Sequence, residues 1–218
     1  QWTKRDMVKW LGIPDEKIFV VYLAADSSAM TPHELQEPEN YFLAVGTLEP
    51  RKNLERVILA FMRVVQEHPQ APDKLVLVGR RGQETGRLQR LMKDAGDRVQ
   101  ATGYLSDERL AELYRHAKAL VYPSLYEGFG LPVLEAMGRG CPVITSNTTS
   151  LPEVAGNAAI CVDPTDIDGI ARAISRVLTQ RDLRQELARN GIARAAEFSW
   201  DRCAKETVQV YEHVLNHA

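Results

Sequence analysis

The chain has 218 residues, of which 44% are hydrophobic and 7% aromatic, so it can bury the core of one large domain or two small ones. Its 27 basic and 29 acidic residues give a formal net charge of -2, which excludes a global attraction to nucleic acid, and any anion site must be a local cluster. No run of about 18 apolar residues occurs, which excludes a membrane-spanning helix in this sequence.

The cysteines indicate the cellular compartment, and the first residues indicate how the sequence relates to a longer chain. Cys141, Cys161 and Cys203 are odd in number and far apart, and no C-x-x-C pair occurs, so we predict no disulfide or zinc framework. This usage indicates a reducing compartment, the cytoplasm. The sequence opens at Gln1 within the helix-like phrase WTKRDMVKWLG, and we therefore expect a fragment of a longer chain whose targeting signals lie outside it.

Residues 1–40 are predicted to contain a helix, a strand and a loop. The helix is the phrase WTKRDMVKWLG at 2–12. The β-branched and aromatic residues of KIFVVYLAAD at 17–26 predict a strand. The proline and polar residues of SSAMTPHELQEPEN at 27–40 are typical of a loop.

From Tyr41 onward, short apolar runs alternate with amphipathic helix patterns. This alternation predicts right-handed β-α-β units and an α/β fold, with a Rossmann-like, doubly wound, mostly parallel sheet and helices on both faces. The predicted strands lie at 41–46, 74–79, 98–103, 119–124, 142–145 and 158–163, and the predicted helices at about 53–67, 84–94, 106–116, 131–138 and 150–154.

The rest of the chain is predicted to be a helical C-terminal tail. Asp163 is the expected N-cap of its first helix, with Pro164 at the first helical position and Asp166 and Asp168 in the first turn. Further helices are predicted at about 181–197 and 200–215. The expected single domain thus has a first helix, strand and loop at 1–40, a Rossmann-like core at 41–163 and the tail at 164–218.

Residues directly after the predicted strands are informative, because open parallel sheets bind ligands beyond the carboxyl ends of their strands. Arginine and lysine neutralise phosphate oxygens, and glycines let backbone N–H groups approach an anion at the start of a helix. Each such residue alone is usually a solvated charge or a turn former, but together they predict a diphosphate site. They are Arg51, Lys52, Arg80, Arg81, Tyr104, Glu127, Gly128, Gly130, Ser146, Asn147 and Thr148.

Several other motifs are interpreted as structural. The phrase GRRGQETG has glycines at 79, 82 and 86 and does not match G-x-G-x-x-G, which disfavours a nicotinamide site. Helix capping explains Asp166 and Asp168, and His213 and His217 stand near the chain end without a third ligand, so no metal is expected. The acceptor-like triplet Asn147-Thr148-Thr149 is not expected to be glycosylated in a reducing compartment.

Glu127 and Glu135 lie eight positions apart around a Gly-Phe-Gly turn, within YEGFGLPVLEAMGRGCPVIT. This block resembles the signature of the C-terminal, donor-binding domain of the retaining GT-B glycosyltransferases of the "group 1" family (family 4), and mannosyltransferases in particular. The phrases VGTLEPRKNL, LVLVGRRG, TGYLSDERLAELYRHA and SLPEV resemble other blocks of that family in the same order. The resemblance covers nearly the whole chain and implies one half of a GT-B fold.

The resemblance implies a role for each matching residue. Arg51 and Lys52 would hold the donor diphosphate and stabilise its departure, and Glu127 would accept hydrogen bonds from the hexose near the reacting centre. These three are the expected catalytic residues. Glu135 would accept hydrogen bonds from the ribose hydroxyls. The other expected donor-binding residues are Gly46, Gly79, Arg80, Tyr104, Leu105, Gly128, Phe129, Gly130 and Leu131.

Some features depart from the family pattern. Thr47 stands where some relatives carry a basic residue, so phosphate binding is expected to rest more on Arg51. The region SNTTSLPE is poorer in glycine than is usual in the family. The resemblance implies an N-terminal acceptor domain, with a histidine that the family places near the sugar, and we expect this domain to lie outside the sequence. We therefore expect the chain to bind donor without turning it over alone.

The expected function is transfer of a hexosyl group from a nucleotide-sugar, GDP- or UDP-linked and with GDP-mannose as the first choice, to a glycan or lipid-linked acceptor in polysaccharide biosynthesis. No cofactor, metal or nucleic acid is expected, and the missing domain could place the protein at the inner face of the membrane. Two alternatives remain open. One is a non-catalytic nucleotide-binding or interaction module, and the other is a glycoside hydrolase that uses Glu127 and Glu135 across one scissile bond.

Overall fold

The computed structural model describes residues 1–25, 37–71, 73–83 and 85–217. Its centre is a six-stranded parallel sheet with the strand order β3-β2-β1-β4-β5-β6. The order reverses between β1 and β4, which are neighbours in the sheet although β2 and β3 separate them in the sequence. The strands are β1 (Tyr41–Val45), β2 (Lys74–Val78), β3 (Val99–Gly103), β4 (Leu120–Tyr122), β5 (Val143–Ser146) and β6 (Ile160–Val162).

The sheet separates two hydrophobic cores. Successive side chains of a strand point to opposite faces, so in β1 Phe42 and Ala44 enter one core while Tyr41 and Leu43 enter the other. All four are buried, as expected for a parallel strand that is covered on both faces. This burial explains why the strand reads as a continuous apolar run rather than an alternating one.

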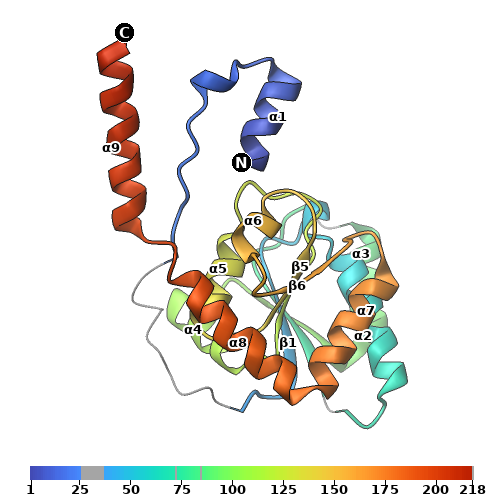
Figure 1. Cartoon of the computed structure of the whole chain (residues 1–218). Helices are drawn as coiled ribbons and strands as arrows, with labels where there is room; N and C mark the ends of the chain where they lie inside the picture. The colour runs from blue at the N-terminus through green and yellow to red at the C-terminus, as the bar shows by residue number, and fades with distance from the viewer. Residues whose placement is uncertain (26–36, 72, 84, 218) are drawn as a thin grey trace.

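Helices cover both faces of the sheet (Figure 1). On one face lie α2 (Leu54–Glu67), α3 (Gly86–Ala95) and α7 (Ile167–Thr179), and on the other lie α4 (Asp107–His116), α5 (Leu131–Gly138) and α6 (Leu151–Ala155). Helix α8 (Arg181–Ala195) contacts both α5 and α7 and contributes Leu187 to the first core and Ala195 to the second. The predicted Rossmann-like, doubly wound α/β fold is therefore confirmed.

Several helix boundaries have local causes in the sequence. The Thr85 hydroxyl accepts a hydrogen bond from the Leu88 N–H at 3.0 Å and caps α3, and the Ser106 hydroxyl caps α4 in the same way. The helix predicted to begin at Glu84 begins at Gly86, and Glu84 itself lies outside the described residues. Short 3-10 turns lie at η1 (Asp15–Lys17), η3 (Pro50–Lys52) and η4 (Gly96–Arg98).

The N-cap predicted at Asp163 is wrong. Helix α7 begins at Ile167 with Asp166 as its N-cap residue. Asp163 instead accepts hydrogen bonds from the backbone N–H and the hydroxyl of Thr165, both at 2.7 Å. This local turn competes with helix formation, so Pro164 lies before the helix rather than in its first turn.

Two segments extend from the sheet and its covering helices, and we call them the arms (Figure 1). The N-terminal arm comprises α1 (Trp2–Leu11) and the chain up to residue 25, and the C-terminal arm is α9 (Trp200–His217). Neither α1 nor α9 contains a buried residue. The strand predicted at 17–26 is wrong over its described part, since residues 18–25 have no regular structure and no paired strand. The loop predicted at 27–40 lies largely outside the described residues.

Two expectations concern the whole chain. Among the described residues, no helix is both long and apolar enough to cross a membrane. Cys141, Cys161 and Cys203 are all free, and burial raises the pKa of the Cys141 thiol to about 12. Cys141 is therefore an unreactive core residue.

Candidate functional site

The candidate site lies where the strand order reverses. The chain leaves β1 toward α2 on one face of the sheet and leaves β4 toward α5 on the other. The two loops therefore start at the switch point of the carboxyl edge, which is the position at which open α/β sheets bind ligands. The loop after β1 carries Arg51 and Lys52, and the loop after β4 carries Glu127.

These three predicted residues meet at one carboxylate. Oε2 of Glu127 accepts a hydrogen bond from the Arg51 guanidinium at 2.8 Å, and Oε1 lies 2.7 Å from Nζ of Lys52. The Lys52 and Glu127 side chains are only 8% and 9% exposed. The carboxylate is thus a buried ion that is paired with two cations from the neighbouring loop. Arg51 also contacts Glu49, so two cations and two carboxylates balance in this cluster.

The surroundings of Glu127 keep it ionised. Burial raises the pKa of its carboxyl, but the hydrogen bond and charge of Lys52, together with the Tyr122 hydroxyl, outweigh burial and hold the pKa below its usual value. Burial also lowers the pKa of Lys52 from its usual value, against the opposing effect of Glu127. The lowered pKa of Glu127 keeps this carboxyl ionised near neutral pH.

Tyr122 is a member of this cluster that the sequence did not single out. It ends β4, is 3% exposed, donates its hydroxyl proton to Oε1 of Glu127 at 2.8 Å and accepts a hydrogen bond from Nζ of Lys52. In the sequence it is one more aromatic residue in an apolar strand. Its only signal is its place as the last strand residue, five positions before Glu127.

Arg51 is the more accessible cation. Its side chain is 46% exposed, and its guanidinium contacts Glu49 at 2.6 Å as well as Glu127. Its backbone carbonyl accepts a hydrogen bond from the Leu125 N–H at 2.8 Å, which ties the loop after β1 to the loop after β4. The guanidinium is therefore accessible from solvent while its backbone stays fixed.

Two predicted glycines allow the backbone to pack tightly beneath the site. A Cβ atom on Gly79 would lie 2.0 Å from the Gly46 carbonyl oxygen, and one on Gly46 would lie 2.8 Å from Cε of Lys52. Both glycines have positive φ angles, 154° and 135°. A side chain at either position would separate the two loops or displace Lys52.

Ser150 and Leu151, at the start of α6, support the loop from Glu127 to Leu131. The Ser150 hydroxyl lies 2.8 Å from the Glu127 carbonyl and 3.0 Å from the Phe129 carbonyl. Gly130 has a φ of 110°, and a Cβ atom there would lie 2.5 Å from Leu151. Gly128 has open space where a Cβ would stand, and Leu131 is the first residue of α5.

Glu135 lies in a different environment from Glu127. It projects from α5 toward α4, where its Oε2 accepts a hydrogen bond from the hydroxyl of the fully buried Tyr114 at 3.1 Å. Burial raises the pKa of Glu135 above its usual value, and the Tyr114 hydrogen bond and the Arg139 charge only partly oppose this. The two glutamates are therefore held by different partners rather than as one acid pair.

The loops after β2 and β3 bring further predicted residues together. The Arg80 guanidinium lies 4.8 Å from the centroid of the Tyr104 ring, and Tyr104 is 64% exposed. Leu105 packs against the core on the α4–α5 face. A cation over an exposed aromatic ring presents a flat surface on which a planar ligand group can stack.

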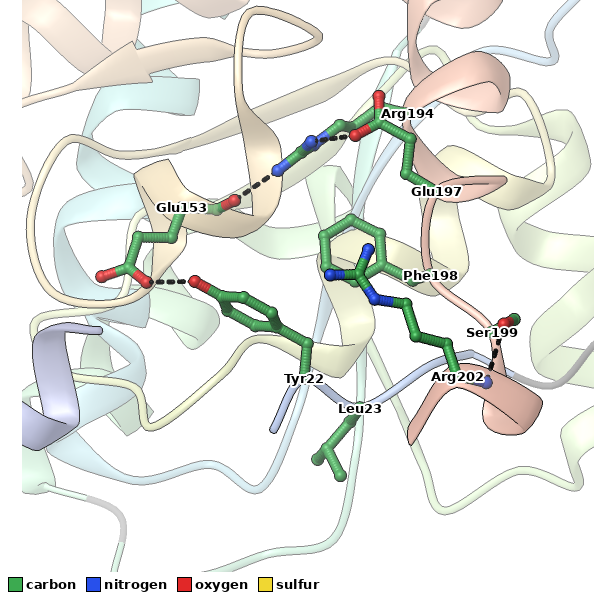
Figure 2. A pocket seen from close by; sticks show the side chains of 8 residues that line it. All are labelled: Tyr22, Leu23, Glu153, Arg194, Glu197, Phe198, Ser199 and Arg202. Carbon is green, nitrogen blue, oxygen red and sulfur yellow. Dashed lines mark hydrogen bonds and ion pairs between the residues drawn. The ribbon is translucent and has the colours of Figure 1, made fainter. Parts of the chain in front are cut away.

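Two cavities lie next to the N-terminal arm. One of about 220 Å³ is lined by residues from the N-terminal arm, α6 and the α8–α9 corner, which include Tyr22, Glu153, Arg194, Phe198 and Arg202 (Figure 2). The other, of about 320 Å³, lies between the N-terminal arm and Gly128 and Phe129. Arg51, Lys52, Glu127 and Glu135 are not among the described residues that line them. Within the described ranges, no group of three acidic, histidine or cysteine residues could hold a metal.

Comparisons with known proteins agree with this geometry. The family model described as "Glycosyl transferases group 1" matches residues 26–194. The chain is 37% identical over 224 residues to the O-antigen chain mannosyltransferase B of Escherichia coli, across 97% of this chain and 58% of the relative. It is 35% identical to the MMP alpha-(1->4)-mannosyltransferase of Mycolicibacterium hassiacum, across 96% of this chain and 52% of the relative. The chain thus spans little more than half the length of these relatives.

Solved structures resemble the whole chain. The sucrose-phosphate synthase from Thermosynechococcus elongatus superposes with a TM-score of 0.82 at 27% identity, over 100% of this chain and 57% of that one. Anabaena HepE, solved in complex with UDP and glucose, gives a TM-score of 0.80 at 19% identity over 97% of this chain and 60% of its own length, a likeness of fold alone.

Proposed function

The chain belongs to the group 1 glycosyltransferases, and we propose that it is the donor-binding domain of a retaining hexosyltransferase that uses a nucleotide-sugar. The proposed transferred group is mannosyl, with GDP-mannose as the first choice of donor and a glycan or lipid-linked polysaccharide as acceptor. The names of the similar E. coli and M. hassiacum proteins, both mannosyltransferases, support this choice of sugar.

The observation that carries the proposal is the meeting of Arg51, Lys52 and Glu127 at the switch point of the sheet. Two cations from one loop lie within 2.8 Å of a single carboxylate, and the Arg51 side chain is 46% exposed. A diphosphate would take the place of Glu49 beside the Arg51 guanidinium, whose fork matches the geometry of phosphate oxygens.

In the proposed mechanism, Arg51 and Lys52 stabilise the negative charge that develops on the diphosphate as it leaves the sugar. Such stabilisation is effective when the charged groups are positioned beforehand, and the Glu127 cluster fixes both cations. Glu127 would accept hydrogen bonds from the donor hexose. The backbone from Gly128 to Leu131 would lie along the sugar and phosphate.

The nucleoside half of the donor would lie against neighbouring elements. Glu135 would accept hydrogen bonds from the ribose hydroxyls, and the Arg80–Tyr104 pair would stack on the base, with Gly46, Gly79 and Leu105 forming the floor and wall. No metal is needed in this proposal, because the two cations supply the charge for which other phosphate-transferring enzymes use a divalent ion.

The arms are proposed to contact an N-terminal, acceptor-binding domain. Exposed apolar side chains gather on them, more than a solvated helix needs. The residues are Trp10, Leu11, Phe19, Leu23, Trp200, Val208, Tyr211, Val214 and Leu215. Pairing of residues 18–22 with a sheet of that domain would supply the neighbouring strands that the apolar run lacks here.

A thermal-shift panel of nucleoside diphosphates and nucleotide-sugars tests the proposal. A ligand at one hundred times its dissociation constant stabilises the folded chain by about 2.7 kcal/mol, which is a clear shift in melting temperature. We expect GDP and GDP-mannose to give the largest shifts. No shift with any guanosine or uridine diphosphate at millimolar concentration would refute the donor site.

The two alternatives give different results. The hydrolase requires one protonated and one ionised carboxyl across a single bond, and hydrolysis of an aryl mannoside by this chain would favour it. A non-catalytic module would bind nucleoside diphosphate and nucleotide-sugar equally well, because it has no site for the transferred hexose. Tighter binding of GDP-mannose than of GDP therefore favours the transferase.

A further inference from the structure

The Tyr122 hydroxyl occupies the inner side of the Glu127 cluster. Tyr122 is anchored by β4, where it pairs with Thr145 of β5, and its ring packs in the core on the α4–α5 face. Burial raises the pKa of its hydroxyl well above the usual value, with further contributions from Glu127, so the hydroxyl keeps its proton. It therefore serves as a donor to Glu127 and an acceptor for Lys52 at the same time.

This arrangement makes the two oxygens of Glu127 unequal. Oε1 receives its hydrogen bonds from two buried groups, Lys52 at 2.7 Å and Tyr122 at 2.8 Å. Oε2 is contacted by Arg51, whose side chain is 46% exposed. Oε1 therefore faces two buried groups, and Oε2 faces the more exposed Arg51.

Lys52 alone would not fix this orientation. Its ammonium is a point charge at the end of a flexible stem and can follow either oxygen as the carboxylate rotates. The phenol ring of Tyr122 is rigid and set in the sheet, and Nζ of Lys52 lies 4.7 Å from its centroid. The hydroxyl thus defines a direction for the hydrogen bond that neither cation defines.

We propose that Tyr122 is a positioning residue for the donor sugar: its hydroxyl holds Glu127 so that Oε2 faces the transferred hexose and keeps Lys52 beneath the carboxylate. This inference rests on the proposed function and extends it to a residue that never touches the donor. Sugar recognition then depends on Tyr122. Binding of the plain diphosphate rests instead on the exposed Arg51 rather than on Lys52, whose side chain is only 8% exposed and which acts on the charge that develops as the diphosphate leaves.

The matched pair of variants is Tyr122→Phe and Tyr41→Phe. Each removes one hydroxyl from a buried tyrosine of the same sheet, but the Tyr41 hydroxyl bonds the Leu113 carbonyl at 2.8 Å, away from the cluster. Calorimetric affinities for GDP and GDP-mannose, with UDP and UDP-glucose as the second pair, give the sugar's contribution as a ratio. For Tyr122→Phe we expect this ratio to fall about tenfold and the affinity for the plain diphosphate to change less than about twofold. Tyr41→Phe should change neither.

A second readout needs no ligand. The charged and titratable groups that face the Glu127 carboxyl are Arg51, Lys52 and Tyr122, and the Tyr122 hydrogen bond lowers its pKa. Carbon-detected NMR titration should therefore give a higher Glu127 pKa in Tyr122→Phe than in the unaltered chain. Tyr41→Phe should leave it unchanged.

The outcomes separate two failures. If the unaltered chain binds none of the four ligands, the donor site is refuted and the role of Tyr122 with it. If it binds them and Tyr122→Phe weakens diphosphate and nucleotide-sugar equally, or leaves the Glu127 pKa unchanged, only the positioning role is refuted. Melting temperatures of both variants identify a general loss of folding.

Discussion

Glu127 and Glu135 are the same residue type, eight positions apart, yet the structure gives them opposite electrostatic settings. Glu127 is buried with two cations and a hydroxyl, which hold its pKa below the usual value. Glu135 is half-buried beside the Tyr114 phenol and the charge of Arg139, which only partly oppose the effect of burial, and its pKa is raised. The spacing in the sequence carries no information on this difference, because the partners come from other parts of the chain.

The comparison also suggests a division of labour. An acid with a lowered pKa stays ionised and can hold cations in place, so it suits the end of the site where charge develops. An acid with a raised pKa remains a weaker, hydrogen-bonding group, which suits contact with neutral hydroxyls. Four substitutions at the two sites can break or sharpen this division.

The largest effect is expected from Lys52→Met. This substitution removes one partner of a buried ion pair. A buried charge that has lost its partner typically lowers the free energy of unfolding by about 3 kcal/mol or more. Urea unfolding at pH 7 measures this loss of stability, with the exposed Lys93→Met as the control.

The loss should depend on pH. Because the Glu127 pKa is lowered, its pairing stabilises the folded chain above the usual pKa of 4.5, and this stability is lost as the pH falls through the lower, folded value. The deficit should therefore shrink on acidification, and a loss below about 1 kcal/mol at pH 7 contradicts the pairing.

A smaller effect is expected on ligand binding. Glu135→Ala should weaken GDP and GDP-mannose alike, about tenfold, because it removes an acceptor for the ribose that both contain. Glu127→Gln should weaken only GDP-mannose by a similar factor, since it removes a sugar contact and reduces repulsion of the phosphates. Calorimetry measures both, and equal losses for the two ligands in Glu127→Gln would refute the division.

The smallest effect is expected from Glu135→Gln. A carboxyl whose folded pKa is raised stabilises the folded state below its unfolded pKa, and this stability is lost as the pH rises through the folded pKa. At pH 7 the unaltered chain therefore bears the cost of a buried charge that glutamine avoids while keeping an oxygen for the Tyr114 hydroxyl. We expect the variant to be about 0.5 kcal/mol more stable at pH 7, and the gain to vanish near pH 4. A variant that is less stable at both pH values contradicts the raised pKa.

Much of the fold follows from the sequence. The apolar runs from Tyr41 onward and the helix patterns between them correspond to the strands and helices of the sheet, with boundaries shifted by a few residues. The exceptions have physical causes. The run at 17–26 has the composition of a strand, but a strand needs a neighbour, and its described residues have none. Asp163 has the chemistry of an N-cap, but its side chain is engaged by Thr165.

The candidate site was predictable only as a set of loops. The carboxyl-edge rule places Arg51, Lys52 and Glu127 at neighbouring positions without stating that they touch. Their mutual pairing depends on loop geometry, in which Gly46 provides the space for the Lys52 stem. The sequence does not single out Tyr122, because an aromatic residue in a buried strand ordinarily serves packing. Only the hydrogen bonds of its hydroxyl indicate a role in the site.

The exposed arms have a practical consequence for optical measurements. The three tryptophans, Trp2, Trp10 and Trp200, all lie in α1 and α9, whereas the two cores on either side of the sheet contain tyrosine and phenylalanine. Tryptophan fluorescence therefore reports on the arms, and far-ultraviolet dichroism reports mainly on the sheet and its covering helices, which contain most of the regular structure. An unfolding experiment followed by both probes can give two different midpoints while the sheet itself unfolds in one cooperative step. The separation between the midpoints would measure how loosely the arms are attached, and its disappearance on adding a second domain would mark their docking.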